Sequence, residues 1–180
     1  MERSDDKAPE QASPDVLRCR LPAEAWRGVC CGDCPEHDGS DDAAEAANRP
    51  YCFGTSDVLD PLNLARSYAL SFEGPREVSE VHAWASECVF MMLHSHPVAA
   101  LEVIRLAAEL AETDWQRTMI GCGNLESLLG NHDRTMIDAV ERLAGESPAF
   151  RYCLGNVWQH GMADDVYARV LAASGRGSGQ

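Results

Sequence analysis

The sequence predicts an all-α fold: a compact array of about seven short antiparallel helices, arranged like HEAT-type hairpins, behind a poorly ordered N-terminal segment. Three observations predict it. From residue 57 onward, apolar residues recur at intervals of three and four. Residues that start or stop helices, such as Asp-Pro, Ser-Pro and Gly-Pro, separate these runs. Strand-like alternation of apolar and polar residues is not sustained anywhere in the chain.

The first two helices follow from their end signals. Asp60-Pro61 predicts a helix start, because aspartate caps free amides and proline is harmless at the first helical position. This helix is expected to end near Gly74-Pro75. Ser79 is predicted to cap the second helix, whose apolar positions run at helical spacing from Val81 to Leu93. That helix must stop before Pro97.

The third and fourth helices follow directly. Pro97 opens the third helix, which presents apolar residues as far as Ala111. Thr113–Gln116 has the spacing of a capping box and predicts the start of the fourth. Gly121 and Gly123 are expected to disturb this helix, because glycine weakens a helix interior.

The last helices are separated by glycine and proline signals. Asn124 is predicted to restart a helix that closes at Gly130-Asn131, and a fifth helix is expected over Arg134–Ala144. Ser147-Pro148 begins the sixth helix. A seventh is expected over Ala163–Ala173.

The chain divides into three parts by composition. Residues 1–56 are rich in Pro, Gly, Asp and Ser and are predicted to be disordered or weakly structured, with a short apolar patch at Leu17, Leu21 and Trp26. Residues 57–174 form the helical domain. Residues 175–180 are predicted to be a flexible tail.

Charge and hydropathy limit the partners. The formal net charge of −14 argues against binding to nucleic acid or an anionic membrane, and suits a basic protein partner or plain solubility. No apolar run is long enough to span a bilayer, and the acidic N-terminus lacks the apolar core of a secretory signal. A cytoplasmic location is therefore expected, where the eight cysteines are thiols or metal ligands.

The stretch CCGDCPEH at residues 30–37 is a candidate zinc site. A Cys-x-x-Cys turn places two thiolates on one short loop, and zinc prefers four sulfur or nitrogen ligands. An unstructured or merely packed cysteine loop is the alternative, and a redox pair is less favoured because Pro35 begins no convincing helix. The candidate ligands are Cys31, Cys34, His37 and Cys30, with Cys19 or Cys52 available to complete the set.

Other polar residues have ordinary structural explanations. His94 and His96 could form a two-imidazole site, but a helix C-terminus and a linker explain them better. His132 and Asp133 could be drawn as an acid–base pair, but adjacent helical residues do not face each other, and the end of one helix and the start of another explain them better. Glu126 is the best single candidate for a functional carboxylate, because it lies among leucines.

Several residues are predicted to serve the core. Cysteine and tryptophan on apolar helix faces are more often core residues than ligands. Arg151 is expected to pair with an acidic residue across helices. The predicted core residues of these types are Cys88, Cys122, Cys153, Trp84, Trp115 and Trp158.

A series of short segments between residues 62 and 174 carries a family resemblance. They are LARSYALSF, the tryptophan-bearing HAWASECVFMML, the proline-started HPVAALEVI, GNLESLLGNH, and the set Pro148, Phe150, Arg151, Leu154 and Trp158. Their order resembles a bacterial family catalogued as domain of unknown function 6869, although Asn124 stands where the family has proline. The resemblance implies a helical architecture and carries no activity with it.

Two functions remain open from the sequence. The first is a non-catalytic protein-interaction module, including an immunity-type role in which an acidic surface neutralises a basic protein. The second is a zinc-binding protein or metal-dependent enzyme that uses Cys31, Cys34 and His37. No cofactor is expected apart from the zinc of this second hypothesis.

Overall fold

The computed structural model describes residues 18–26, 29 and 59–176. These residues form helices and no β-strand, which confirms the all-α prediction. A single 3₁₀ turn, η1 (Ala23–Trp26), precedes them. The other elements are α2 (Pro61–Leu70), α3 (Arg76–Ser95), α4 (Pro97–Leu110), α5 (Asp114–Ile120), the π-helical segment η3 (Gly121–Leu125), α6 (Glu126–Glu146), α7 (Pro148–Leu154) and α8 (Asp164–Ser174).

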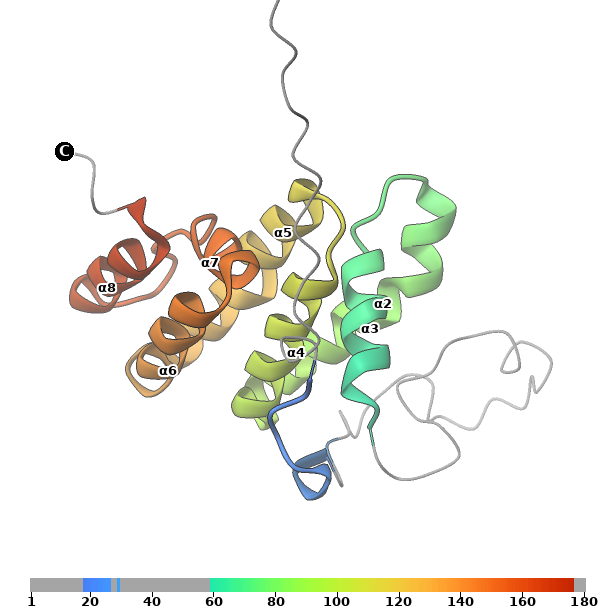
Figure 1. Ribbon diagram of the computed structural model, residues 1–180, viewed down its shortest axis with the longest axis horizontal. Helices are drawn as coiled ribbons and strands as arrows, with labels where there is room; N and C mark the ends of the chain where they lie inside the picture. The colour runs from blue at the N-terminus through green and yellow to red at the C-terminus, as the bar shows by residue number, and fades with distance from the viewer. Residues whose placement is uncertain (1–17, 27–28, 30–58, 177–180) are drawn as a thin grey trace, which may run out of the picture.

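Helix α4 is the centre of the array (Figure 1). It packs against α2 and α3 on one side and against α5, α6 and α7 on the other, while α8 closes the opposite end by packing on α6 and α7. Every residue from Ala99 to Ala108 is buried. A helix that is enclosed all round is typical of a core helix rather than a surface helix. None of the helices described has the combined length and apolarity of a membrane-spanning helix.

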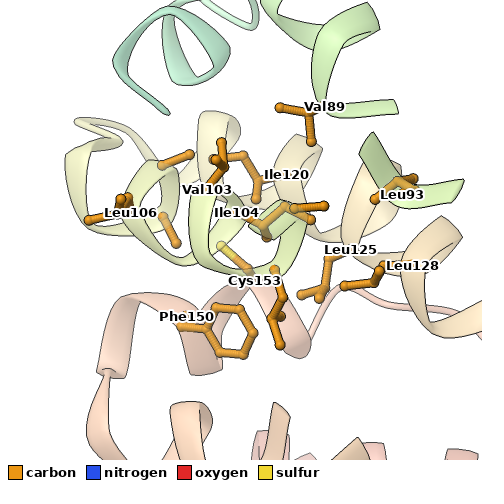
Figure 2. Packing of buried hydrophobic residues seen from close by; sticks show 14 of the residues in the cluster. Val89, Leu93, Val103, Ile104, Leu106, Ile120, Leu125, Leu128, Phe150 and Cys153 are labelled. Atoms are coloured by element: carbon orange, nitrogen blue, oxygen red, sulfur yellow. The ribbon is translucent and has the colours of Figure 1, made fainter. Parts of the chain in front are cut away.

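The core is formed where α4 meets its neighbours (Figure 2). Val103 and Ile104 of α4 lie between Val89 of α3 and Phe150 of α7, and all four are fully buried. Residues of α3, α5, η3, α6 and α7 complete the cluster. The further labelled members are Leu93, Leu106, Ile120, Leu125, Leu128 and Cys153.

Three predicted helix starts are confirmed, and each is a local side-chain cap. Asp60 accepts from the amides of Leu62 and Asn63 at 3.0 and 3.2 Å. The Thr113 and Gln116 side chains form the predicted capping box at the start of α5. Ser147 caps α7.

Two predicted boundaries are wrong. Helix α3 begins at Arg76 after Pro75, and Ser79 does not cap it but donates its hydroxyl to the Arg76 carbonyl at 3.0 Å. The predicted break at Gly130-Asn131 is absent, because α6 continues through it and only kinks at His132 (φ −133°, ψ 28°).

Gly130 serves packing rather than helix termination. A Cβ at this position would lie 2.7 Å from the carbonyl oxygen of His160, so only glycine allows that backbone to approach.

The disturbance predicted at Gly121 and Gly123 is confirmed. Residues 121–125 form a π-helical segment, and Gly123 has non-helical dihedrals (φ −104°, ψ −111°). Beside it, the fully buried Tyr68 hydroxyl has no hydrogen-bond partner among the described residues. Burial raises the pKa of Tyr68 well above its usual range, although neighbouring Asn124 opposes the shift.

A short N-terminal stretch packs on α4 through a buried ion pair. Arg105 is fully buried, and Glu102 is 5% exposed. The Glu102 carboxylate accepts from Arg105 Nε and Nη2 at 3.0 and 2.8 Å, and from the Arg20 amide at 2.7 Å. Arg105 also donates to the Arg18 carbonyl at 2.9 Å, and the Trp26 ring is buried in the core. The composition of residues 18–26 predicts a weakly structured segment and does not indicate this packing.

Candidate functional site

The predicted zinc ligands lie outside the described residues. Cys30, Cys31, Cys34 and His37 all fall in the range 30–58, so their arrangement remains a prediction. Within 18–26, 29 and 59–176, no group of three or more His, Cys, Asp or Glu side chains is placed to hold a metal ion.

Cys19, which the sequence offered as a completing ligand, is described. Its Sγ donates to the carbonyl of Leu21 at 3.5 Å. Burial raises the pKa of the Cys19 thiol, and the nearby Glu102 carboxylate acts in the same direction. In this arrangement Cys19 is a thiol rather than a thiolate.

The histidines between α3 and α4 occupy the structural positions expected for them. His94 lies in the last turn of α3, where its exposed ring makes an edge-on contact with Phe90. His96 is the residue between the two helices, and its Nδ1 lies 2.9 Å from the Ser95 hydroxyl. Neither belongs to a metal-binding cluster of the described residues.

His132 and Asp133 do not act on each other. His132 donates from Nε2 to the carbonyl of Leu93 at 2.7 Å and so joins the kink in α6 to α3. Asp133 accepts the amide of Ala163 at 3.1 Å, in the segment that leads into α8. Backbone amides of Ala163 and Arg134 hold the pKa of Asp133 below its usual range. The pair therefore supports the fold at two separate points.

Two of the predicted core cysteines are confirmed. Cys88 and Cys153 are buried, whereas Cys122 is half-buried and donates weakly to the Met119 carbonyl at 3.9 Å. Burial raises the pKa of Cys153 to about 12. Its thiol is therefore protonated at neutral pH and is not a ready nucleophile.

Glu126 has a structural partner in the connection between α7 and α8. Its Oε2 accepts the backbone amide of Trp158 at 2.9 Å. The side chain is half-buried. Glu126 thus anchors the backbone of Trp158. Of the large hydrophobic side chains described, that of Trp158 is the most exposed.

Residues 155–163, termed here the display loop, connect α7 to α8 and carry Trp158. The prediction that Trp158 and Trp115 belong to the core is wrong, because their side chains are 67% and 61% exposed. Trp84 is half-buried against the core. The Gly155-Asn156 pair is a turn signal that ends the helix before Trp158, and it could have indicated the exposed position.

The display loop is held at several points. Val157 and Met162, on either side of Trp158, are buried in the core. Glu126 of α6 binds the amide of Trp158 itself, and Asp133 of α6 binds the amide of Ala163 at the end of the loop. Because apolar anchors and hydrogen bonds hold the backbone on both sides, the Trp158 indole is presented to solvent from a fixed position.

Helix α8, which follows the display loop, is tied to α6 by two arginines. Arg134 of α6 makes two hydrogen bonds of 3.0 Å to Asp165. Arg169 of α8 binds Glu141 and Asp138, and its guanidinium lowers the pKa of Glu141. Exposed pairs of this kind contribute little stability singly, but together they set the position of α8 on α6.

A groove of about 410 Å³ lies at the ends of α7 and α8. Of the described residues, two arginines and no carboxylate line it. Arg151 was predicted to pair with an acidic residue across helices; that prediction is wrong, since its exposed side chain forms no ion pair with any described residue. No sequence signal relates it to Arg176, because only the fold brings the two together. The lining residues include Pro148, Arg151, Tyr152, Asn156, Ser174 and Arg176.

The family comparison covers most of the helical array. The family model described as a family of unknown function, DUF6869, matches residues 73–177, from just before α3 to the end of α8. No curated protein and no solved structure matches the chain. The match covers more than half of the sequence and includes the display loop and the groove. The chain therefore belongs to the DUF6869 family, whose function is unknown.

Proposed function

We propose that the chain is a non-catalytic protein-interaction module that engages its partner through Trp158. The observation that carries the proposal is the 67% exposed indole on a loop whose two ends are anchored. A partner that covers this large apolar ring gains hydrophobic contact area. Because the loop backbone is already ordered, binding loses little conformational entropy.

Two further exposed aromatic side chains lie on elements near the display loop. Trp115 on α5 is 61% exposed, and Tyr152 on α7 is 42% exposed. Helix α5 packs against α7, and the display loop follows α7 directly. Tryptophan and tyrosine dominate the binding energy of many interfaces, so exposed rings from adjoining elements favour a protein ligand.

The proposed partner is basic. The net charge of −14 accelerates encounter with a positively charged protein and repels nucleic acid. In its immunity-type form, the same function would be the neutralisation of a basic protein whose active surface the module covers. Retention of such a partner is expected to fall as ionic strength rises.

Replacing Trp158 by alanine is expected to weaken partner binding about 30-fold or more, because loss of a central tryptophan costs about 2 kcal/mol. The measurement is retention of cellular proteins on immobilised wild-type chain and on Trp158→Ala, at low and high salt, followed by affinity of the retained protein. Thermal unfolding should be unchanged, since the indole makes little contact with the core.

Phe90→Ala is the matched control. Phe90 is also an exposed aromatic residue, 47% exposed, but lies on α3 rather than near α7. Retention of the same partner should survive this change. A partner held equally by wild type and Trp158→Ala would contradict the proposed role of the display loop.

The spacing of Cys31, Cys34 and His37 supports a second candidate function, zinc binding. Protein purified without chelator is then expected to contain stoichiometric zinc, which Cys31→Ser/Cys34→Ser loses. Cys122→Ser, which alters a half-buried thiol on η3, should retain the metal. Wild-type protein without zinc in an elemental analysis would rule this candidate out.

A further inference from the structure

We infer that the groove at the ends of α7 and α8 binds a carboxylate of an acidic peptide segment. The site is about 410 Å³ in volume, which is within the usual range of ligand pockets. In naming a peptide, this inference rests on the proposed interaction function, and the peptide is a local acidic segment of the otherwise basic partner. The carboxylate site itself rests only on the groove.

The charges in the groove are unbalanced. Arg151 and Arg176 both line it, and among the described residues no Asp or Glu does. Neither forms an ion pair with a described residue, whereas most described arginines do. The paired arginines are Arg20, Arg76, Arg105, Arg117, Arg134 and Arg169. Two guanidinium groups that share a groove without a counter-charge repel each other, and a bound anion would relieve that repulsion.

The geometry holds one of these cations in place. Arg176 donates from Nη1 to the Gly155 carbonyl at 2.6 Å, and the Gly155 amide in turn binds the Arg151 carbonyl at 3.0 Å. Arg176 is thereby attached to the end of the helix that carries Arg151. Most of its N–H groups remain available, and guanidinium N–H groups match the two oxygens of a carboxylate.

The apolar part of the groove favours a peptide over a small free anion. Pro148 and the Tyr152 ring line it beside the cations. The Asn156 side chain is held by its bond to the Tyr152 carbonyl at 2.9 Å, which stabilises the turn under the groove. An extended acidic segment could contact both the apolar and the cationic parts, whereas inorganic phosphate would use the cations alone.

The test is binding of a short fluorescein-labelled peptide of alternating glutamate and leucine to the full chain, measured by anisotropy. The same peptide with glutamine in place of glutamate should not bind. Arg151→Gln/Arg176→Gln is expected to weaken the glutamate peptide at least about tenfold, since each lost hydrogen bond to a charged group costs about 1.5 kcal/mol or more. Inorganic phosphate at equal concentration should not displace it.

Arg142→Gln is the matched control, because Arg142 is exposed on α6 without an ion pair among the described residues and does not line the groove. It should leave peptide affinity unchanged. Equal loss in this control, equal competition by phosphate, or no binding to wild type would each overturn the inference. If the partner still depends on Trp158 while the peptide does not bind, the groove inference fails and the proposed function stands.

Discussion

Replacing Glu102 by glutamine is expected to lower the free energy of unfolding by about 3 kcal/mol. The change keeps the shape of the side chain but leaves the fully buried Arg105 guanidinium without its carboxylate in the centre of α4. It also weakens the bond from the Arg20 amide that holds the N-terminal stretch on α4. Removing one partner of a buried ion pair is far more costly than the loss of a surface pair.

Glu80→Gln is the control for this prediction. Glu80 pairs with Arg76 one turn away on α3, but both side chains are more than half exposed. Its loss should change stability by less than about 0.5 kcal/mol. Both variants can be compared by urea unfolding followed by circular dichroism. Equal midpoints for the two would show that Glu102 and Arg105 are not buried against each other.

Gly121→Ala is expected to destabilise the protein by about 3 kcal/mol. A Cβ at Gly121 would overlap the carbonyl oxygen of Cys153 and lie 3.1 Å from the Cβ of Asn156. Because the nearest atoms belong to the backbone of α7, they cannot rotate away, and the junction of α5 and η3 must move off α7. The same movement would disturb Asn156 and the start of the display loop.

Gly145→Ala is the matched substitution. Gly145 lies in the last turns of α6, and no atom of another part of the chain lies within 4 Å of an added Cβ. Alanine there should stabilise the helix by up to about 1 kcal/mol, because it restricts the unfolded chain. Thermal melts of the two variants should therefore shift in opposite directions. A Gly121→Ala protein as stable as wild type would contradict the close contact between η3 and α7.

The Glu102 and Gly121 substitutions disturb two different contacts between elements of the fold. Glu102 and Arg105 join α4 to residues that lie more than eighty positions earlier in the chain. Gly121 joins η3 to α7 and so supports the loop that presents Trp158. Loss of Trp158 itself should leave the fold unchanged and affect binding only. A loss of stability therefore identifies the packing residues Glu102 and Gly121, and a loss of partner retention in a stable protein identifies the contact residue Trp158.

The helices could be predicted from the sequence because their signals are local. Asp60, Thr113 and Ser147 cap amides two or three residues away, and Pro97 stands at the first position of α4, where the missing amide of proline costs no hydrogen bond. Most buried positions followed from three- and four-residue spacing, which needs only the helix period, but Val81 and Val98, which have the same spacing, are 52% and 55% exposed.

Predictions failed where a distant segment decided the outcome. Gly130 has the chemistry of a helix stop, but α6 continues through it, and the His160 carbonyl packs where a side chain at this position would stand. Trp158 has the large apolar side chain of a core residue, but it lies beyond the end of α7, where its backbone amide binds Glu126. Arg151 was expected to form an ion pair with an acidic residue, but no described Asp or Glu pairs with it.

The sequence by itself determined the helical class, most helix starts and most buried faces, since each depends on residues within one or two turns. Only the tertiary structure decided that Arg151 and Arg176 share a groove and that Trp158 stands exposed on an anchored loop. Side chains far apart in the chain meet through packing of the helices between them. No short-range pattern encodes that packing, because it depends on the combined shape of all the buried residues.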